Sequence, residues 1–194
     1  MRIPQRKADL ETLVDEELMR LVGKGYEAAF TLLYQRYAPR LYGFLLKMLE
    51  HDAERARDLL HDIFLSVMEH PGKFDTGKKF STWIYTVAAN RCRNELRNQG
   101  TRRDILLALA KTGDTQVSMR YAAHDMQQFR EQLQAYLDAM EEETRILFLL
   151  RFRQELSIKE IAAIMGLAEG TVKSRLFYLV RSLAEKLRVY HPYK

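Results

Sequence analysis

Residues 157–181 read SIKEIAAIMGLAEGTVKSRLFYLVR, and this stretch defines the C-terminal half of the chain. Ser157 and Glu160 have the spacing of a capping box, in which a serine and a glutamate satisfy free amides at a helix start. We expect a short apolar helix to follow, then a turn at Gly166, then a longer basic helix from near Glu169. A short helix, a glycine-containing turn and a basic second helix together are typical of a helix-turn-helix.

The second helix of this motif has two different faces. At 100° per residue, one arc is apolar and should pack on the first helix: Val172, Leu176, Leu179, Val180, Leu183 and Leu187. The opposite arc combines cations with groups that can contact base edges: Thr171, Lys173, Ser174, Phe177, Tyr178 and Arg181, with Arg175 at its flank. This combination favours DNA binding, and the alternatives are a face for a partner protein or an ordinary surface helix.

The composition narrows the class of protein. The chain has 194 residues and a single cysteine, Cys92, so it can form neither an internal disulfide nor a cysteine-based zinc site. A reducing compartment fits this usage best. The longest apolar run, residues 105–110, is too short to cross a bilayer, and no signal peptide is visible. We therefore expect a cytoplasmic protein with no membrane insertion of its own.

The positive charge is concentrated at two places in the chain. The net charge is +5, but residues 73–103 carry 8 basic and 2 acidic groups, and residues 170–194 carry 6 and 1. A polyanion held at two points would explain this pattern. Chance variation among solvated helix faces explains it about equally well, if charge alone is considered.

The pattern of apolar residues predicts helices nearly throughout, without strand-type alternation. Helices are expected over 15–23 and 26–37, and over 39–49 with Pro39 in its first turn. Asp52 should cap the next helix, Pro71-Gly72 should end it, and Ser81 should cap a further helix over 82–97. The prediction is an all-α fold with two helical domains, 10–97 and 128–190, joined by a linker over 98–127.

The basic helix over 82–97 and the segment before it form a second candidate site. Several polar residues share one helix face, with Trp83 at its edge: Thr86, Asn90, Arg93, Asn94 and Arg97. Just upstream lie Phe74, Lys78, Lys79 and Phe80. Aromatic rings interleaved with cations and amides suit unstacked single-stranded DNA. Taken singly, Phe80 and Trp83 fit a core position better, because large aromatic residues are mostly buried.

These residues carry a resemblance to a known family. The pieces ARDLLHDIF (56–64) and FSTWIYTVAANRCRNELR (80–97) resemble the second conserved region of bacterial sigma factors, the promoter-specificity subunits of RNA polymerase. The pieces EIA (160–162) and EGTVKSRL (169–176) resemble the fourth region. The regions that lie between these two in larger sigma factors are absent, which is the mark of the extracytoplasmic-function (ECF) group.

The resemblance implies a role for each matching position. One set would dock on the β′ clamp helices of core RNA polymerase: Asp58, Leu59, His61, Asp62 and Phe64. A second set would bind the single-stranded −10 element and trap a flipped base: Phe74, Lys78, Lys79, Phe80, Trp83, Asn90, Arg93, Asn94 and Arg97. A third would bind the −35 element: Thr171, Lys173, Ser174, Arg175, Phe177, Tyr178 and Arg181. The family also implies contact with the β flap and with an anti-sigma factor.

The length of the linker predicts how the domains behave. An unstructured 30-residue linker averages roughly 30 Å end to end, whereas promoter elements one and a half helical turns apart need roughly 50 Å. We therefore expect polymerase to hold the domains apart, and the free protein to be compact or mobile.

The sequence thus predicts a sigma factor that directs promoter recognition, −10 melting and transcription initiation. The main alternative is a conventional helix-turn-helix regulator with an N-terminal sensor or dimerisation domain, and a third is a sigma mimic that binds only a regulator. No enzyme, metal site or cofactor is expected, because the five histidines form no H-E-x-x-H pattern and no phosphate-binding glycine loop occurs.

Overall fold

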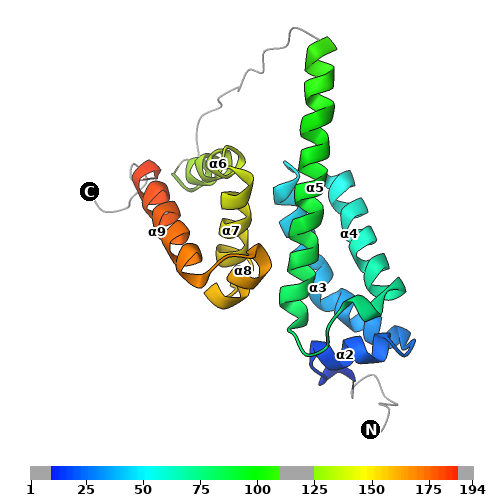
Figure 1. Cartoon of the computed structure of the whole chain (residues 1–194). Helices are drawn as coiled ribbons and strands as arrows, with labels where there is room; N and C mark the ends of the chain where they lie inside the picture. Colours follow the sequence, from blue (N-terminus) through cyan, green and yellow to red (C-terminus); the bar gives the residue numbers. More distant parts are fainter. Residues whose placement is uncertain (1–9, 110–124, 188–194) are drawn as a thin grey trace.

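The computed structural model describes residues 10–109 and 125–187, and all of its regular structure within these ranges is helical (Figure 1). The N-terminal bundle contains α2 (Asp15–Val22), α3 (Glu27–Met48), α4 (Ala53–Glu69), the short 3-10 helix η1 (Pro71–Lys73) and α5 (Phe80–Leu109). The C-terminal bundle contains α6 (Asp125–Asp138), α7 (Glu142–Phe152), α8 (Ile158–Met165) and α9 (Glu169–Lys186). The predicted all-α fold with two helical domains is confirmed.

The N-terminal bundle forms around the long helix α3, which packs against α2, α4 and α5. Its centre consists of side chains with no exposed surface, among them Leu33, Phe44, Ile63 and Ile84. Asp52 caps α4 as predicted, because its carboxylate accepts a hydrogen bond of 3.1 Å from the backbone N–H of Arg55.

The prediction that separate helices span 26–37 and 39–49 is wrong, since α3 runs unbroken through Pro39. A proline inside a helix removes one backbone donor and costs about 3 kcal/mol. Pro39 lies on the exposed side of the helix, whereas apolar residues on either side of it, such as Leu33 and Leu41, are fully buried. Burial of one continuous apolar face therefore outweighs the local cost.

Helix α5 also differs from its prediction at both ends. It begins at Phe80, and its first turn is capped by the carboxylate of Glu16 in α2 rather than by Ser81. It continues through residues 98–100 to Leu109, so the first part of the expected linker is helical. One glycine costs a helix only about 1 kcal/mol, and the leucines, alanine and arginines that follow Gly100 are good helix formers. The remainder of the expected linker, 110–124, lies outside the described residues.

The C-terminal bundle contains the predicted helix-turn-helix in α8 and α9. Ser157 and Glu160 form the capping box, with the Ser157 N–H donating to the Glu160 carboxylate at 3.0 Å. Gly166 ends α8 in the left-handed conformation, at a φ of 67°, which glycine adopts without strain. Val172, Leu176 and Leu179 are buried as expected, but Val180 is 47% exposed and faces a groove instead of the core.

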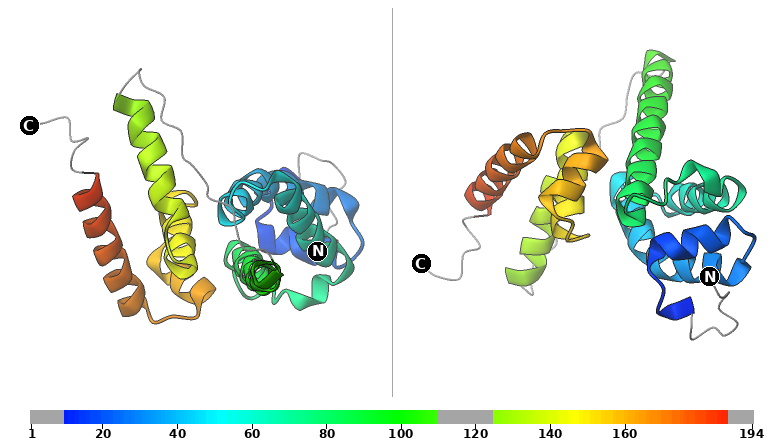
Figure 2. Two further views of the ribbon diagram at one scale, coloured as in Figure 1. Left: turned by 90° about the horizontal axis from the view of Figure 1, so that it is seen from above. Right: turned by 60° about the horizontal axis from the view of Figure 1, so that its bottom comes forward.

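The two bundles are docked on each other. Helix α8 lies against α5, and α7 lies against α3 (Figure 2). A buried hydrogen bond of 2.5 Å joins the two sides, with the Tyr85 hydroxyl donating to Oε1 of Gln154. The buried guanidinium of Arg145 binds the carbonyls of Asp138 and Met140 in its own domain, and it reaches the carbonyl of Met48 at the end of α3 at 3.5 Å.

Candidate nucleic-acid and polymerase interfaces

Three aromatic rings pack on one another where the loop between η1 and α5 begins and ends. The ring centroids of Phe74, Phe80 and Trp83 lie 5.3 to 5.7 Å apart. Phe74 is 4% exposed and Phe80 is fully buried, whereas Trp83 is half-buried. In this conformation both rings are part of the core, and the contact of Phe74 and Phe80 with DNA stays a prediction. They position the loop, and its polar residues remain at the surface.

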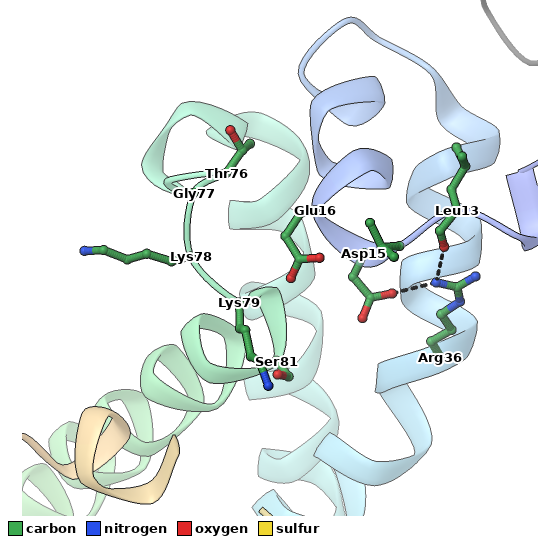
Figure 3. Close-up of a pocket in the computed structure, with 10 residues that line it drawn as sticks. Leu13, Asp15, Glu16, Arg36, Thr76, Gly77, Lys78, Lys79 and Ser81 are labelled. Atoms are coloured by element: carbon green, nitrogen blue, oxygen red, sulfur yellow. Dashed lines mark hydrogen bonds and ion pairs between the residues drawn. The ribbon is translucent and has the colours of Figure 1, made fainter. Parts of the chain in front are cut away.

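A cavity of about 550 Å³ opens between this loop and α2 (Figure 3). Its lining combines apolar, acidic and basic side chains with the loop backbone: Leu13, Val14, Asp15, Glu16, Arg36, Thr76, Gly77, Lys78, Lys79 and Ser81. The Asp15 carboxylate is already bound, since it pairs with Arg36 at 2.6 Å and accepts from the Tyr37 hydroxyl. The sequence did not single out the α2 side of this cavity, because no local pattern brings residues 13–16 to the loop.

The loop between η1 and α5 contains a turn stabilised by Asp75, and it forms an ion pair with the C-terminal domain. The Asp75 carboxylate accepts from the Gly77 N–H at 2.9 Å, which closes a tight turn. Lys79 pairs with Glu160 of α8 at 3.0 Å. Burial alone would raise the pKa of Glu160, but hydrogen bonds from Ser157 and Lys79 outweigh it and hold this pKa below its ordinary value. The capping box and the interdomain pair thus share one carboxylate.

The polar face predicted on α5 is present. Nη1 of Arg93 donates to the Asn90 side chain at 2.8 Å, and Arg97 donates to that of Asn94 at 3.0 Å. The Arg93 guanidinium also contacts both carboxylate oxygens of Glu143 in α7, at 2.7 and 3.4 Å. In this conformation, therefore, the C-terminal domain engages two of the expected −10 contacts, Lys79 and Arg93.

The outward face of α9, in contrast, is exposed to solvent. All seven residues predicted for it are exposed: Thr171, Lys173, Ser174, Arg175, Phe177, Tyr178 and Arg181. The rings of Phe177 and Tyr178 are 62% and 66% exposed and meet edge to face, with centroids 5.6 Å apart. The structure thus brings these cations and aromatic rings together on one surface.

A groove that the sequence did not indicate adjoins this face. It has a volume of about 410 Å³ and is lined by Arg151, Phe152, Ile158, Lys173, Leu176, Phe177 and Val180. Phe152, at the end of α7, is 45% exposed. The apolar side chains of this lining, together with Arg151 and Lys173, would suit a partner helix with apolar and acidic residues.

The residues expected to meet the polymerase clamp lie on α4. Asp58, His61 and Asp62 are exposed and Leu59 is half-buried, but Phe64 is only 2% exposed. Phe64 packs on Tyr34 with ring centroids 4.7 Å apart. It is therefore a core residue that supports the face of α4, and its direct contact with the polymerase stays a prediction. Beside this face lies an apolar cavity of about 420 Å³ lined by Tyr34, Gln35, Ala38, Pro39, Tyr42 and Leu60, which the sequence also did not indicate.

Other kinds of site receive no support in the described ranges. Among residues 10–109 and 125–187, no three histidine, cysteine or acidic side chains are grouped to hold a metal ion. Burial raises the pKa of the Cys92 thiol to about 12, so the thiol stays protonated and unreactive. No helix in the described part of the chain is long and apolar enough to span a membrane.

Comparison with known proteins identifies the class of the chain. Residues 33–102 match the family model Sigma-70 region 2, and residues 130–178 match Sigma-70, region 4. The first match runs from within α3 to within α5 and includes the loop, and the second runs from within α6 to within α9 and includes the turn of the helix-turn-helix. The two regions follow each other in the order found in RNA polymerase sigma factors.

Similar proteins narrow the family further. The chain is 33% identical over 164 residues to the RNA polymerase sigma factor CarQ of Myxococcus xanthus, covering 84% of this chain and 91% of the relative. It is 26% identical over 186 residues to the ECF RNA polymerase sigma-E factor of Escherichia coli, covering 92% and 96%. The chain belongs to the ECF sigma factors of RNA polymerase. Its function is that of this family, namely promoter recognition in transcription initiation, and a conventional helix-turn-helix regulator is not favoured.

Two solved structures share the fold. CnrH, solved in complex with the cytosolic domain of CnrY, matches with a TM-score of 0.67 and 19% identity, over 90% of this chain and 97% of that one. The sigma factor RpoE from Bartonella quintana, solved with the anti-sigma factor NepR, matches with a TM-score of 0.64 and 23% identity, over 82% and 97%.

Proposed function

We propose that residues 10–97 bind core polymerase and the −10 element, that residues 128–190 bind the −35 element, and that the segment between them links the two. The observation that carries this assignment is the outward face of α9, where all seven predicted residues are exposed together. Cations on such a face neutralise phosphates, while hydroxyl and aromatic groups contact base edges and the thymine methyl. In this assignment the chain performs no chemistry of its own, needs no cofactor and acts in the cytoplasm with the polymerase.

The −10 element would meet the loop over 75–79 and the polar face of α5. Lys78 and Lys79 carry the charge for the backbone of the single strand, and the adjoining cavity of about 550 Å³ receives one unpaired base. Trp83, Asn90, Arg93, Asn94 and Arg97 extend the same path along α5. Phe74 and Phe80 act from the core by fixing the loop.

The docked arrangement has to open for this function. Lys79 and Arg93 are paired with Glu160 and Glu143 of the C-terminal domain, so the strand and the domain compete for the same cations. We infer that binding to polymerase separates the domains. The exposed residues Asp58, His61 and Asp62 on α4, with Leu59 beside them, would then contact the β′ clamp helices, and the C-terminal domain would contact the β flap.

An anti-sigma factor is the partner proposed for the free chain. The relatives CnrH and RpoE were solved with CnrY and with the anti-sigma factor NepR, respectively. The groove that contains Phe152 and Phe177 offers such a partner an apolar surface together with the cations Arg151 and Lys173. A partner seated there would cover part of the −35 face.

Run-off transcription with core bacterial polymerase and a library of genomic promoters tests the assignment. We expect new start sites only when the chain is added, loss of these starts with Lys173→Ala or Asn90→Ala, and no loss with Lys159→Ala, a matched control on the exposed side of α8. No new starts, together with duplex DNA binding that still depends on Lys173, would contradict the sigma assignment and favour a simple DNA-binding regulator.

A further inference from the structure

Glu16 is the residue that joins α2 to the start of α5. It lies in the first turn of α2, and its Oε1 accepts a hydrogen bond of 2.8 Å from the backbone N–H of Phe80. The first amides of a helix have no partner within the helix, and a carboxylate at that end is favoured by the helix dipole. Glu16 therefore holds the residue at which the loop over 75–79 turns into α5.

The Glu16 carboxylate lines the cavity beside the loop. Figure 3 shows the Glu16 carboxylate between the loop and Asp15, at the edge of the open space. Among the described residues, none donates a hydrogen bond to Oε2 of Glu16. The neighbouring carboxylate of Asp15 differs in this respect, because Arg36 and Tyr37 already bind it.

The basic side chains of the cavity lie away from this oxygen or are engaged elsewhere. The ammonium of Lys78 points away from Glu16 in Figure 3 and lies 3.9 Å from Asp75. Lys79 pairs with Glu160 of α8. A base that enters the cavity would meet the apolar side chains of Leu13 and Val14, the loop backbone with Thr76 and Ser81, and the Glu16 carboxylate, whose Oε2 has spare capacity to accept.

We infer that Glu16 selects the base trapped in this cavity, favouring a base with an exocyclic amino group over one with a carbonyl oxygen at the same ring position. An ionised carboxylate can only accept hydrogen bonds. It therefore binds the amino group of cytosine or adenine and repels the carbonyl oxygen of thymine. This inference rests on the proposed function, because it names the kind of base that the −10 cavity receives.

Substituted promoters separate this role from the capping role. The trapped position is first located as the one at which an abasic nucleotide prevents strand opening by the full chain with core polymerase. Two matched pairs of bases are then placed there, cytosine with uracil and adenine with hypoxanthine, since each pair exchanges an amino group for a carbonyl oxygen. Opening is followed by the fluorescence of 2-aminopurine at a neighbouring position.

We expect the amino member of the better-fitting pair to open about tenfold more effectively, as a hydrogen bond to a charged group would provide. Glu16→Gln separates the two roles. Its amide oxygen can still accept from the Phe80 N–H, while its amino group replaces the second carboxylate oxygen. This variant should lose or reverse the preference. Glu27→Gln, an equal change of charge at an exposed residue outside the cavity, should keep it.

Each outcome is decisive. A preference for the amino base that disappears in Glu16→Gln, while the best template still opens, supports the inference. Equal opening of both members of each pair, or an unchanged preference in Glu16→Gln, overturns it but leaves the proposed function intact. Failure to open any template would overturn both.

Discussion

Removing two carboxylates from the C-terminal domain should loosen its docking on α5. Glu143 binds Arg93 through two oxygens, and Glu160 binds Lys79 through one. Glu143→Gln and Glu160→Gln remove the charges without large changes of shape, and a glutamine at 160 can still complete the capping box. Neither substitution alters a residue assigned to the DNA.

The size of the effect follows from the exposure of the partners. The side chains of Arg93 and Glu143 are 24% and 41% exposed, so this two-oxygen pair should contribute about 1 kcal/mol, near the upper end for surface pairs. Lys79 is 71% exposed, and its pair should contribute about 0.5 kcal/mol. Together the two changes should raise the ratio of open to docked molecules about tenfold, since 1.4 kcal/mol corresponds to that factor.

Two measurements on the free chain test this prediction. Fluorescent labels at Lys24→Cys and Ala184→Cys report the distance between the domains, and the buried Cys92 should not be labelled. The double variant should show a larger open fraction, and its affinity for a single-stranded −10 oligonucleotide should rise up to tenfold. The control is Glu141→Gln with Glu155→Gln, which changes the net charge equally at exposed residues of the same domain. Equal distances and affinities in the two double variants would refute the idea that these pairs hold the domains together.

Three further predictions concern single residues. Pro39→Ala should stabilise the protein by about 1 kcal/mol in urea unfolding, because it restores a backbone donor in α3 at some cost in unfolded-chain entropy; a loss of stability would show that the proline ring packs better than its exposure suggests. Cys92 should react with a thiol reagent only as fast as the bundle unfolds, since burial raises its pKa to about 12, and rapid labelling of the folded chain would contradict this. The pKa of Glu160 lies below its ordinary value of 4.5, so its ionised form stabilises the fold above that value and the contribution is lost as the pH falls through the lowered pKa. Wild-type stability should therefore decline more steeply on acidification than that of Glu160→Gln, and parallel declines would rule out this role.

Local sequence patterns predicted the features that depend on neighbours along the chain. The cap at Asp52 and the box formed by Ser157 and Glu160 were predictable because capping needs only three or four consecutive residues. The exposed face of α9 followed in the same way from helical periodicity. The break expected at Pro39 failed because the buried residues of α3 pack against other helices, and this long-range burial outweighs a local signal.

The roles of the aromatic residues could be predicted only in part. The family resemblance assigned Phe64 a contact with the polymerase, whereas the structure buries its ring against Tyr34. Phe74 and Phe80 likewise combine a position in a functional segment with a core environment. Such a segment needs rigid support from within, so a residue can belong to the motif without touching the ligand.

Helix α5 connects the docking contacts to the proposed −10 site. Its start is held by Glu16 and by the rings of Phe74 and Trp83, its next turn carries Tyr85 bound to Gln154, and Arg93 lies two turns further on. Because a continuous helix moves as a rigid body, the contacts of Tyr85 and Arg93, and that of Lys79 directly before the helix, are made and broken against the same partner surface of α7, α8 and the turn between them. Separation of the domains would thus free the loop and the polar face of α5 together. None of these partners is close to α5 in sequence, which is why no local pattern could predict that the docked C-terminal domain engages residues of the proposed −10 site.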